Sequence, residues 1–172
     1  MKGVHINSNL VSFQNRPRIY WTNICDLKQP INLHVNFQDF KSVDFDYCEQ
    51  FKVNKTKSRL KMWSDGNGRN GGGQCSNKTH ADKINCITTK QDRRPNSGLI
   101  EHGDFCRYIT REELEQGQTL PKGYTKSVAY NQACKVVGNA WTVDVICHIF
   151  SSLKKKKQNG QITYLQIKLN LL

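Results

Sequence analysis

The chain contains no apolar run near the roughly 20 residues that cross a membrane, and its first residues lack the basic-then-apolar pattern of a secretory signal. We therefore expect neither a membrane span nor export. Proline is scarce, with 4 in 172 residues, and neither a collagen-like glycine period nor a sustained heptad pattern is present. Collagen and coiled coils are thereby excluded, and no internal repeat is visible.

Acidic residues are also few. The chain has 14 Asp and Glu against 26 Lys and Arg, so its formal net charge is +12. The basic residues gather in four clusters, at residues 16–18, 52–61, 93–94 and 154–157. Because a basic surface neutralises phosphates and releases their counterions, nucleic acid is the expected partner. A well-solvated basic protein without such a partner is the alternative that composition leaves open.

The cysteines lack the CxxC pairs typical of zinc and redox sites, and their number, 7, is odd. We expect reduced thiols in a cytoplasmic protein, which excludes a secreted disulfide knot. Cys75, His80 and Cys86 come closest to a metal-binding fragment, but zinc would need a fourth ligand from a distant segment. We favour ordinary buried or loop thiols and predict no metal site.

Short strands are predicted in several segments. Residues 4–12 and 19–24 form two extended segments around a polar link, because the second is rich in β-branched and aromatic residues. Pro17 has no backbone donor and biases Arg16 toward an extended conformation, so this part is not helical. Further strands are predicted at residues 84–89 and 105–109.

Helices are predicted at four places. Apolar residues three and four apart indicate a short amphipathic helix at residues 37–47, and Thr110 with Glu113 forms a capping box that starts a second. This second helix is brief because Gly117, Pro121 and Gly123 interrupt it. A third is expected at residues 127–137. The last has an apolar stripe of four residues: Val143, Ile146, Phe150 and Leu153.

Two segments look irregular. Residues 64–77 are rich in glycine with almost nothing apolar, which is typical of a flexible loop. A phosphate-binding loop is the alternative, but no strand precedes it, no GK[ST] follows and no helix opens after it. Near the end, apolar residues alternate over 165–171, which predicts an edge strand. The alternative is a tail from a reading frame that slipped at the lysine run.

Three segments carry a family resemblance. Gln14-Asn15-Arg16-Pro17-Arg18, followed by an apolar strand, resembles the QxRxR motif, the eighth, of DNA cytosine-5 methyltransferases. Residues 107–113, continuing to Thr125, resemble the family's ninth motif, and residues 138–146 resemble its tenth. The order and spacing of all three make the match specific over about residues 6–153. The resemblance is nearest to phage and bacterial enzymes and to the eukaryotic de novo type.

The resemblance implies an α/β fold. It is the carboxy-terminal portion of the Rossmann-like sheet of an S-adenosylmethionine-dependent methyltransferase, with a small irregular target-recognition region. Four parts are expected: the end of the catalytic domain with the eighth motif, the recognition region, the ninth and tenth motifs returning to the catalytic domain, and a basic, strand-like tail. Their ranges are residues 1–24, 25–104, 105–153 and 154–172.

The implied activity is transfer of a methyl group from S-adenosylmethionine to C5 of a cytosine flipped out of double-stranded DNA. Flipping costs stacking energy, which contacts to the phosphates and the base must offset. In the family, the second arginine of the eighth motif contacts the flipped base and the first contacts backbone near the site, which implies these roles for Arg18 and Arg16. Gln14 is expected on the same side, because alternate residues of an extended segment share a side. The alternative is that both arginines are simply exposed on a strand.

The tenth motif implies that Asn139, Ala140 and Trp141 line the cofactor pocket, where backbone donors and an aromatic wall suit a nucleoside with a sulfonium group. Ordinary core packing beside the last helix is the alternative for Trp141. Arg107 and Glu113 are implied to support the recognition region. The recognition loop itself implies DNA contacts for four residues: Thr89, Lys90, Arg93 and Arg94.

The chain departs from the family pattern in what it lacks. No proline is followed by cysteine, so the family's catalytic nucleophile is missing, and so are the ENV segment and the glycine-rich cofactor loop. We therefore expect a carboxy-terminal fragment or subunit, inactive alone, with an amino-terminal half as its candidate partner. Gly117 replaces an apolar residue and is expected to loosen its helix by about 1 kcal/mol. The alternatives are a non-catalytic basic DNA-binding module and a relic that does not fold.

Overall fold

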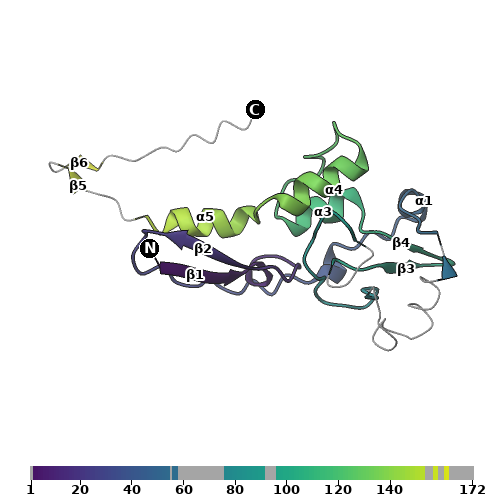
Figure 1. Ribbon diagram of the computed structural model, residues 1–172, viewed down its shortest axis with the longest axis horizontal. Coiled ribbons are helices and arrows are strands. Elements are labelled where there is room, and N and C mark those ends of the chain that lie inside the picture. Colours follow the sequence, from purple (N-terminus) through teal and green to yellow (C-terminus); the bar gives the residue numbers. More distant parts are fainter. Residues whose placement is uncertain are drawn as a thin grey trace.

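The computed structural model describes residues 2–54, 56–57, 76–91, 96–153, 157–158 and 161–162. Arg93 and Arg94, most of the glycine-rich segment 64–77 and the alternating segment 165–171 lie outside the described residues. Figure 1 shows the β1–β2 hairpin and α5 at one end of the molecule, α3 and α4 in the middle, and α1 with the β3–β4 hairpin at the opposite end. In the described part of the chain, no helix is both long enough and apolar enough to cross a membrane.

The elements are short. The strands are β1 (Lys2–Asn7), β2 (Pro17–Thr22), β3 (Ile100–His102), β4 (Phe105–Arg107), β5 (Lys157–Gln158) and β6 (Gln161–Ile162), paired as three antiparallel hairpins. The helices are η1 (Ser8–Leu10), η2 (Phe37–Asp39), α1 (Phe45–Glu49), α3 (Arg111–Gly117), α4 (Tyr130–Asn139) and α5 (Val143–Ser151).

The β1–β2 hairpin confirms the extended segment predicted at residues 19–24 in most of its length and the one predicted at 4–12 only up to Asn7, because Ser8–Leu10 form the short helix η1. Its antiparallel register pairs His5 with Ile19 and Ile6 with Arg18. Pro17 is the first residue of β2, a position where the missing N–H does not interrupt the ladder. The hairpin and the segment after it pack against α5 through a small core of Ile6, Val11, Val145 and Ile149.

Helix α5 forms where it was predicted, but none of the four residues of its predicted apolar stripe is among its buried residues. Val145 and Ile149 are buried, whereas Phe150 and Leu153 are 51% and 49% exposed. The hairpin is narrow, so it covers only one side of the helix. The apolar surface of α5 therefore extends past what this chain can bury.

The main core lies around α3 and α4. It is formed by apolar side chains from distant segments: Phe13, Phe37, Ile84, Ile87, Ile100, Ile109, Leu114, Cys134 and Val137. The strand predicted at residues 105–109 is confirmed over its first three residues. The strand predicted at 84–89 is wrong, because Ile84 and Cys86 make only isolated bridges, to Gln14 and to Asn96.

The single amphipathic helix predicted at residues 37–47 is also wrong. Two short helices, η2 and α1, occur there instead, capped by the side chains of Asn36 and Asp44. Between them, the Ser42 backbone N–H donates to Glu113 Oε1 at 2.7 Å and the Ser42 carbonyl accepts from Arg107 Nη2 at 3.2 Å. A backbone held by a buried ion pair cannot continue a helical ladder. The third helix begins at Tyr130, later than predicted, and runs to Asn139.

Helix α3 confirms the predicted capping box. The Thr110 side chain accepts from the Glu113 N–H, and Glu113 Oε2 accepts from the Thr110 N–H at 2.7 Å. The helix ends at Gly117, which is buried. A Cβ there would lie 2.5 Å from Ile87 Cδ1 and 3.2 Å from Phe13 Cε2, so the expected apolar residue would not fit without moving Ile87. Gly117 therefore packs closely against the ends of the Ile87 and Phe13 side chains.

We expect Gly138→Ala in α4 to destabilise the protein. A Cβ at Gly138 would lie 2.7 Å from Thr88 C and 2.9 Å from Thr89 N, and these are backbone atoms that cannot rotate away. The expected loss is about 2 kcal/mol of unfolding free energy, despite the better helix propensity of alanine. Urea unfolding followed by circular dichroism measures it, with the exposed Lys135→Ala of α4 as the matched control. Equal unfolding midpoints for both variants would contradict the close approach.

Candidate functional site

The three motif segments meet in a buried polar network. Gln14 is fully buried, and its Nε2 donates to the Gly117 carbonyl and, at 2.8 Å, to Gln118 Oε1. Its Oε1 accepts from the Ile87 N–H at 3.1 Å. Gln14 therefore joins the segment before β2 to the end of α3 and to the segment before Lys90.

Three further polar residues complete this network, and sequence reasoning gave them no role in it. Gln118 Nε2 donates to the Val137 carbonyl at 2.8 Å, and Thr142 Oγ1 donates to Gln118 Oε1 at 2.8 Å. The hydroxyls of Ser8 and Thr142 lie 2.8 Å apart. All of these side chains are buried. Gln118 and Thr142 lie inside the two later motif segments, and this placement could have pointed to both of them from the sequence.

Arg16 is also buried, with 4% of its surface exposed. Its Nη1 donates to the Ile87 carbonyl at 2.8 Å, and its Nη2 donates to the carbonyls of Gly138 and Ala140, both at 2.9 Å. Burial lowers the pKa of the Arg16 guanidinium from its ordinary value, an effect that Cys86 opposes and the charge of Arg18 adds to. Arg16 satisfies carbonyls at the end of α4 and fixes the turn that follows.

Arg18 is exposed. Its Nη1 donates to the Pro17 carbonyl at 2.8 Å, and its Nη2 lies 3.5 Å from Cys86 Sγ. Gln14, Arg16 and Arg18 all bond to residues 86–87, so they lie on one side of their segment as alternation predicted. They differ in depth, because only Arg18 reaches the surface.

The last residue of α4 and the turn that follows it carry the residues predicted to bind the cofactor. Asn139 is exposed, Ala140 is half-buried and Trp141 is 65% exposed, so Trp141 is not an ordinary core residue. Trp141 and Arg18 line the same groove of about 490 Å³ between β2 and α5. Arg16 joins the carbonyl of Ala140, so the arginines and residues 139–141 share one junction. An exposed indole beside an exposed amide fits one wall of a nucleoside pocket.

Two of the residues predicted to contact DNA border the same junction. Thr89 and Lys90 are both exposed, and Thr88 Oγ1 donates to the Lys90 carbonyl at 2.7 Å in a tight turn. The backbone of residues 88–89 lies directly against Gly138. The structure therefore places Arg18, Thr89, Lys90, Asn139 and Trp141 on the surface around one junction, while Gln14 and Arg16 lie beneath it.

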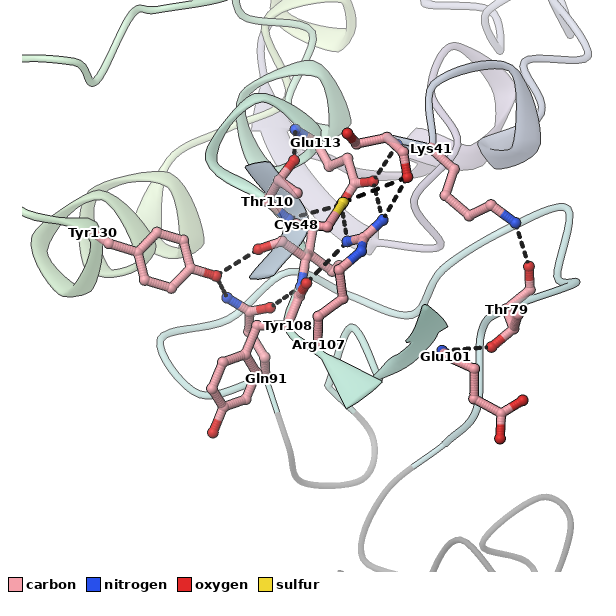
Figure 2. Close-up of polar contacts among 12 residues, drawn as sticks. Lys41, Cys48, Thr79, Gln91, Glu101, Arg107, Tyr108, Thr110, Glu113 and Tyr130 are labelled. Carbon is pink, nitrogen blue, oxygen red and sulfur yellow. Dashed lines mark hydrogen bonds and ion pairs between the residues drawn. The ribbon is translucent and has the colours of Figure 1, made fainter. Parts of the chain in front are cut away.

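A second buried polar cluster joins Arg107 of β4 to Glu113 of α3, and Figure 2 shows its contacts. Arg107 Nη1 and Nη2 pair with the two carboxylate oxygens of Glu113, each at 2.8 Å, and both side chains are almost fully buried. Burial raises the pKa of the nearby Tyr130 hydroxyl well above its ordinary value. Tyr130 thus remains a donor to the Ile109 carbonyl while Gln91 accepts from the Ile109 N–H at 2.8 Å.

The two edges of the β1–β2 hairpin differ. The outer edge of β1 is partly covered, since Gln29 Nε2 donates to the His5 carbonyl at 2.8 Å. Within the described residues, no backbone hydrogen bond joins β2 to an element other than β1. Beside this open edge lie five exposed apolar side chains, which we call the apolar face: Ile19, Trp21, Trp141, Phe150 and Leu153.

Comparison with known proteins identifies relatives of this chain. A family model described as C-5 cytosine-specific DNA methylase matches residues 15–155. Among solved structures, S. pombe Dnmt2 methyltransferase is similar at 14% identity with a TM-score of 0.59, covering 87% of this chain and 55% of that chain. The Entamoeba histolytica methyltransferase EhMeth is similar at 12% identity with a TM-score of 0.62, covering 88% of this chain and 52% of that chain. No curated protein matches the chain significantly.

These likenesses establish the fold. At such low identity they confirm the predicted α/β methyltransferase fold and carry no information on substrate. The chain spans about half the length of both solved methyltransferases.

Proposed function

The chain belongs to the C-5 cytosine-specific DNA methylase family, and from this premise we propose that it is the carboxy-terminal part of a phage- or bacterial-type DNA cytosine-5 methyltransferase. It acts together with an amino-terminal half that supplies the nucleophile. Residues 1–24 complete the catalytic sheet, residues 25–104 recognise the target, and residues 105–153 return to the catalytic domain. The tail after residue 153 has no assigned part in the reaction.

The apolar face is the observation that carries this proposal. Trp21 is 68% exposed and Phe150 is 51% exposed, on either side of one groove. A contiguous apolar surface of this kind marks an interaction site, and an unpaired strand edge is a template for pairing with another chain. An amino-terminal half would cover both features, because it can add a strand to the open edge of β2 and lie over the groove.

The proposed roles of the motif side chains differ with their burial. Arg18 contacts the flipped cytosine, while the buried Gln14 and Arg16 hold the backbone frame from which Arg18 projects. Asn139, Ala140 and Trp141 form one wall of the cofactor pocket. Four residues that follow Ile87 in the sequence contact the DNA backbone and bases: Thr89, Lys90, Arg93 and Arg94.

S-adenosylmethionine supplies an electrophilic methyl group when it is bound. The residues of this chain bind and orient the base and the cofactor, and none of them stands in a Pro-Cys segment. The nucleophilic thiolate and the rest of the cofactor pocket then come from the amino-terminal half. We therefore expect the isolated chain to transfer no methyl group.

The test measures incorporation of labelled methyl from S-adenosylmethionine into DNA. The chain alone, an amino-terminal half with a Pro-Cys segment alone, and the two together are compared, and incorporation is expected only for the pair. Trp21→Glu with Phe150→Glu should abolish both incorporation and co-purification, because two charges would be buried in the contact. Tyr124→Glu is the matched control, since Tyr124 is 49% exposed but does not line the groove.

Either of two results would count against the proposal. Incorporation by the pure chain would show that it needs no partner, and a soluble, assembled but inactive pair would contradict the split enzyme. The exposed Arg18 and Lys90 and the net charge of +12 also favour a second candidate, a non-catalytic DNA-binding module. Salt-sensitive duplex binding that does not change when the amino-terminal half is added would support that candidate.

A further inference from the structure

The thiol of Cys86 lies between two guanidinium groups. Its Sγ is 3.2 Å from Arg16 Nη1 and 3.5 Å from Arg18 Nη2. Cys86 is half-buried, and its backbone makes a bridge to Asn96 while its neighbour Ile87 is fully buried. The sulfur atom therefore has a fixed position at the boundary between the buried network and the surface.

The two arginines are held very differently. Arg16 donates to the carbonyls of Ile87, Gly138 and Ala140, so its guanidinium has one orientation. Besides its contact with Cys86, Arg18 donates to the carbonyl of Pro17, its neighbour in sequence. A contact with the preceding residue does not fix the Arg18 guanidinium relative to other segments of the protein. The contact with Cys86 crosses 68 positions of sequence and fixes the end of the side chain in space.

The sulfur also reduces the repulsion between the two cations. A thiol sulfur accepts hydrogen bonds weakly, but an ionised donor strengthens such bonds. One acceptor that faces both guanidinium groups lets them approach the same point from two directions. Without it, like charges would push Arg18 away from the groove that it shares with Trp141.

We propose that Cys86 is a positioning residue for Arg18. It transmits the fixed orientation of Arg16 to the exposed guanidinium, so the turn at residues 138–141 and Arg18 keep a constant geometry. The inference rests on the proposed function only for what Arg18 then contacts, namely a cytosine in DNA. The thiol takes no part in covalent chemistry here.

The first test measures the order of the Arg18 side chain without DNA. In ¹⁵N relaxation of the full chain, the Arg18 Nε–Hε group should be ordered in the wild type, mobile in Cys86→Ala and ordered again in Cys86→Ser, whose hydroxyl still accepts hydrogen bonds. Cys147→Ala is the control, because Cys147 is an exposed thiol of α5. Equal order of Arg18 in the wild type and in Cys86→Ala would overturn the proposal.

The second test is a double-mutant cycle on affinity for a duplex with a mismatched cytosine. Cys86→Ala should weaken binding about three- to tenfold in the wild-type background, which is the cost of ordering one long side chain, and should have no effect in an Arg18→Ala background. Equal losses in both backgrounds would show that Cys86 acts without Arg18 and would overturn the proposal. A wild-type chain that binds no DNA even when the amino-terminal half is present would contradict the proposed function instead, and the relaxation data would then decide the role of Cys86.

Discussion

Glu113→Ala is expected to lower the free energy of unfolding by about 3–5 kcal/mol. The substitution leaves the Arg107 guanidinium buried without its partner carboxylate, which it now contacts through two bonds of 2.8 Å. It also removes the acceptor for the backbone N–H groups of Thr110 and Ser42. A loss of this size is a large part of the stability of an ordinary domain.

Urea unfolding of matched variants measures this effect. Glu112→Ala is the control, because Glu112 is the adjacent residue of α3 and pairs with Lys122 at 3.5 Å on the surface, where an ion pair contributes about 0–1 kcal/mol. The double variant Arg107→Met with Glu113→Leu should regain much of the loss, since it removes both charges together. If Glu113→Ala were as stable as Glu112→Ala, the buried pair would not have the role described.

Arg16→Ala and Arg18→Ala are expected to have opposite consequences although both remove an arginine of one motif. Arg16→Ala removes the guanidinium donor shared by three backbone carbonyls, of which Ala140 keeps a longer bond from Gln118, and should cost about 3 kcal/mol of unfolding free energy. Arg18→Ala changes an exposed side chain and should cost less than about 0.5 kcal/mol, while it weakens duplex binding. Arg16→Lys should rescue little, because an ammonium cannot reproduce the fork of the guanidinium.

Chemical denaturation and fluorescence anisotropy on a labelled duplex separate these two roles. The expected result is a lower unfolding midpoint for Arg16→Ala only and, among variants that remain folded, weaker binding for Arg18→Ala. A stable Arg16→Ala variant with weak DNA binding would place Arg16 at the surface, in contradiction to its 4% exposure.

The features that could be predicted from the sequence are those specified by adjacent residues. Thr110 and Glu113 start α3 through bonds within four residues, so the capping box is visible without knowledge of the rest of the chain. The hairpin follows likewise from β-branched and aromatic residues beside Pro17. The motif segments that carry the family resemblance are contiguous too, which is why residues 14–18 and 138–146 were found.

The features that could not be predicted depend on distant partners. Residues 84–89 do not form a strand because Gln14, more than seventy positions earlier, takes the Ile87 N–H. The depth of Arg16 depends on carbonyls about 120 positions later. Periodicity indicates which residues of α5 are apolar, but the width of the hairpin beneath it decides which of them are buried. None of these contacts between distant segments can be predicted from a local sequence pattern.

The unequal edges of the β1–β2 hairpin have a consequence for biosynthesis. A strand with one open side pairs with copies of itself when its proper neighbour is scarce. This chain and its proposed partner must therefore be synthesised at similar times and in similar amounts, because surplus copies of this chain would stack through β2 and precipitate. Genes that are translated from one message would meet that demand, and overproduction of this chain by itself would not.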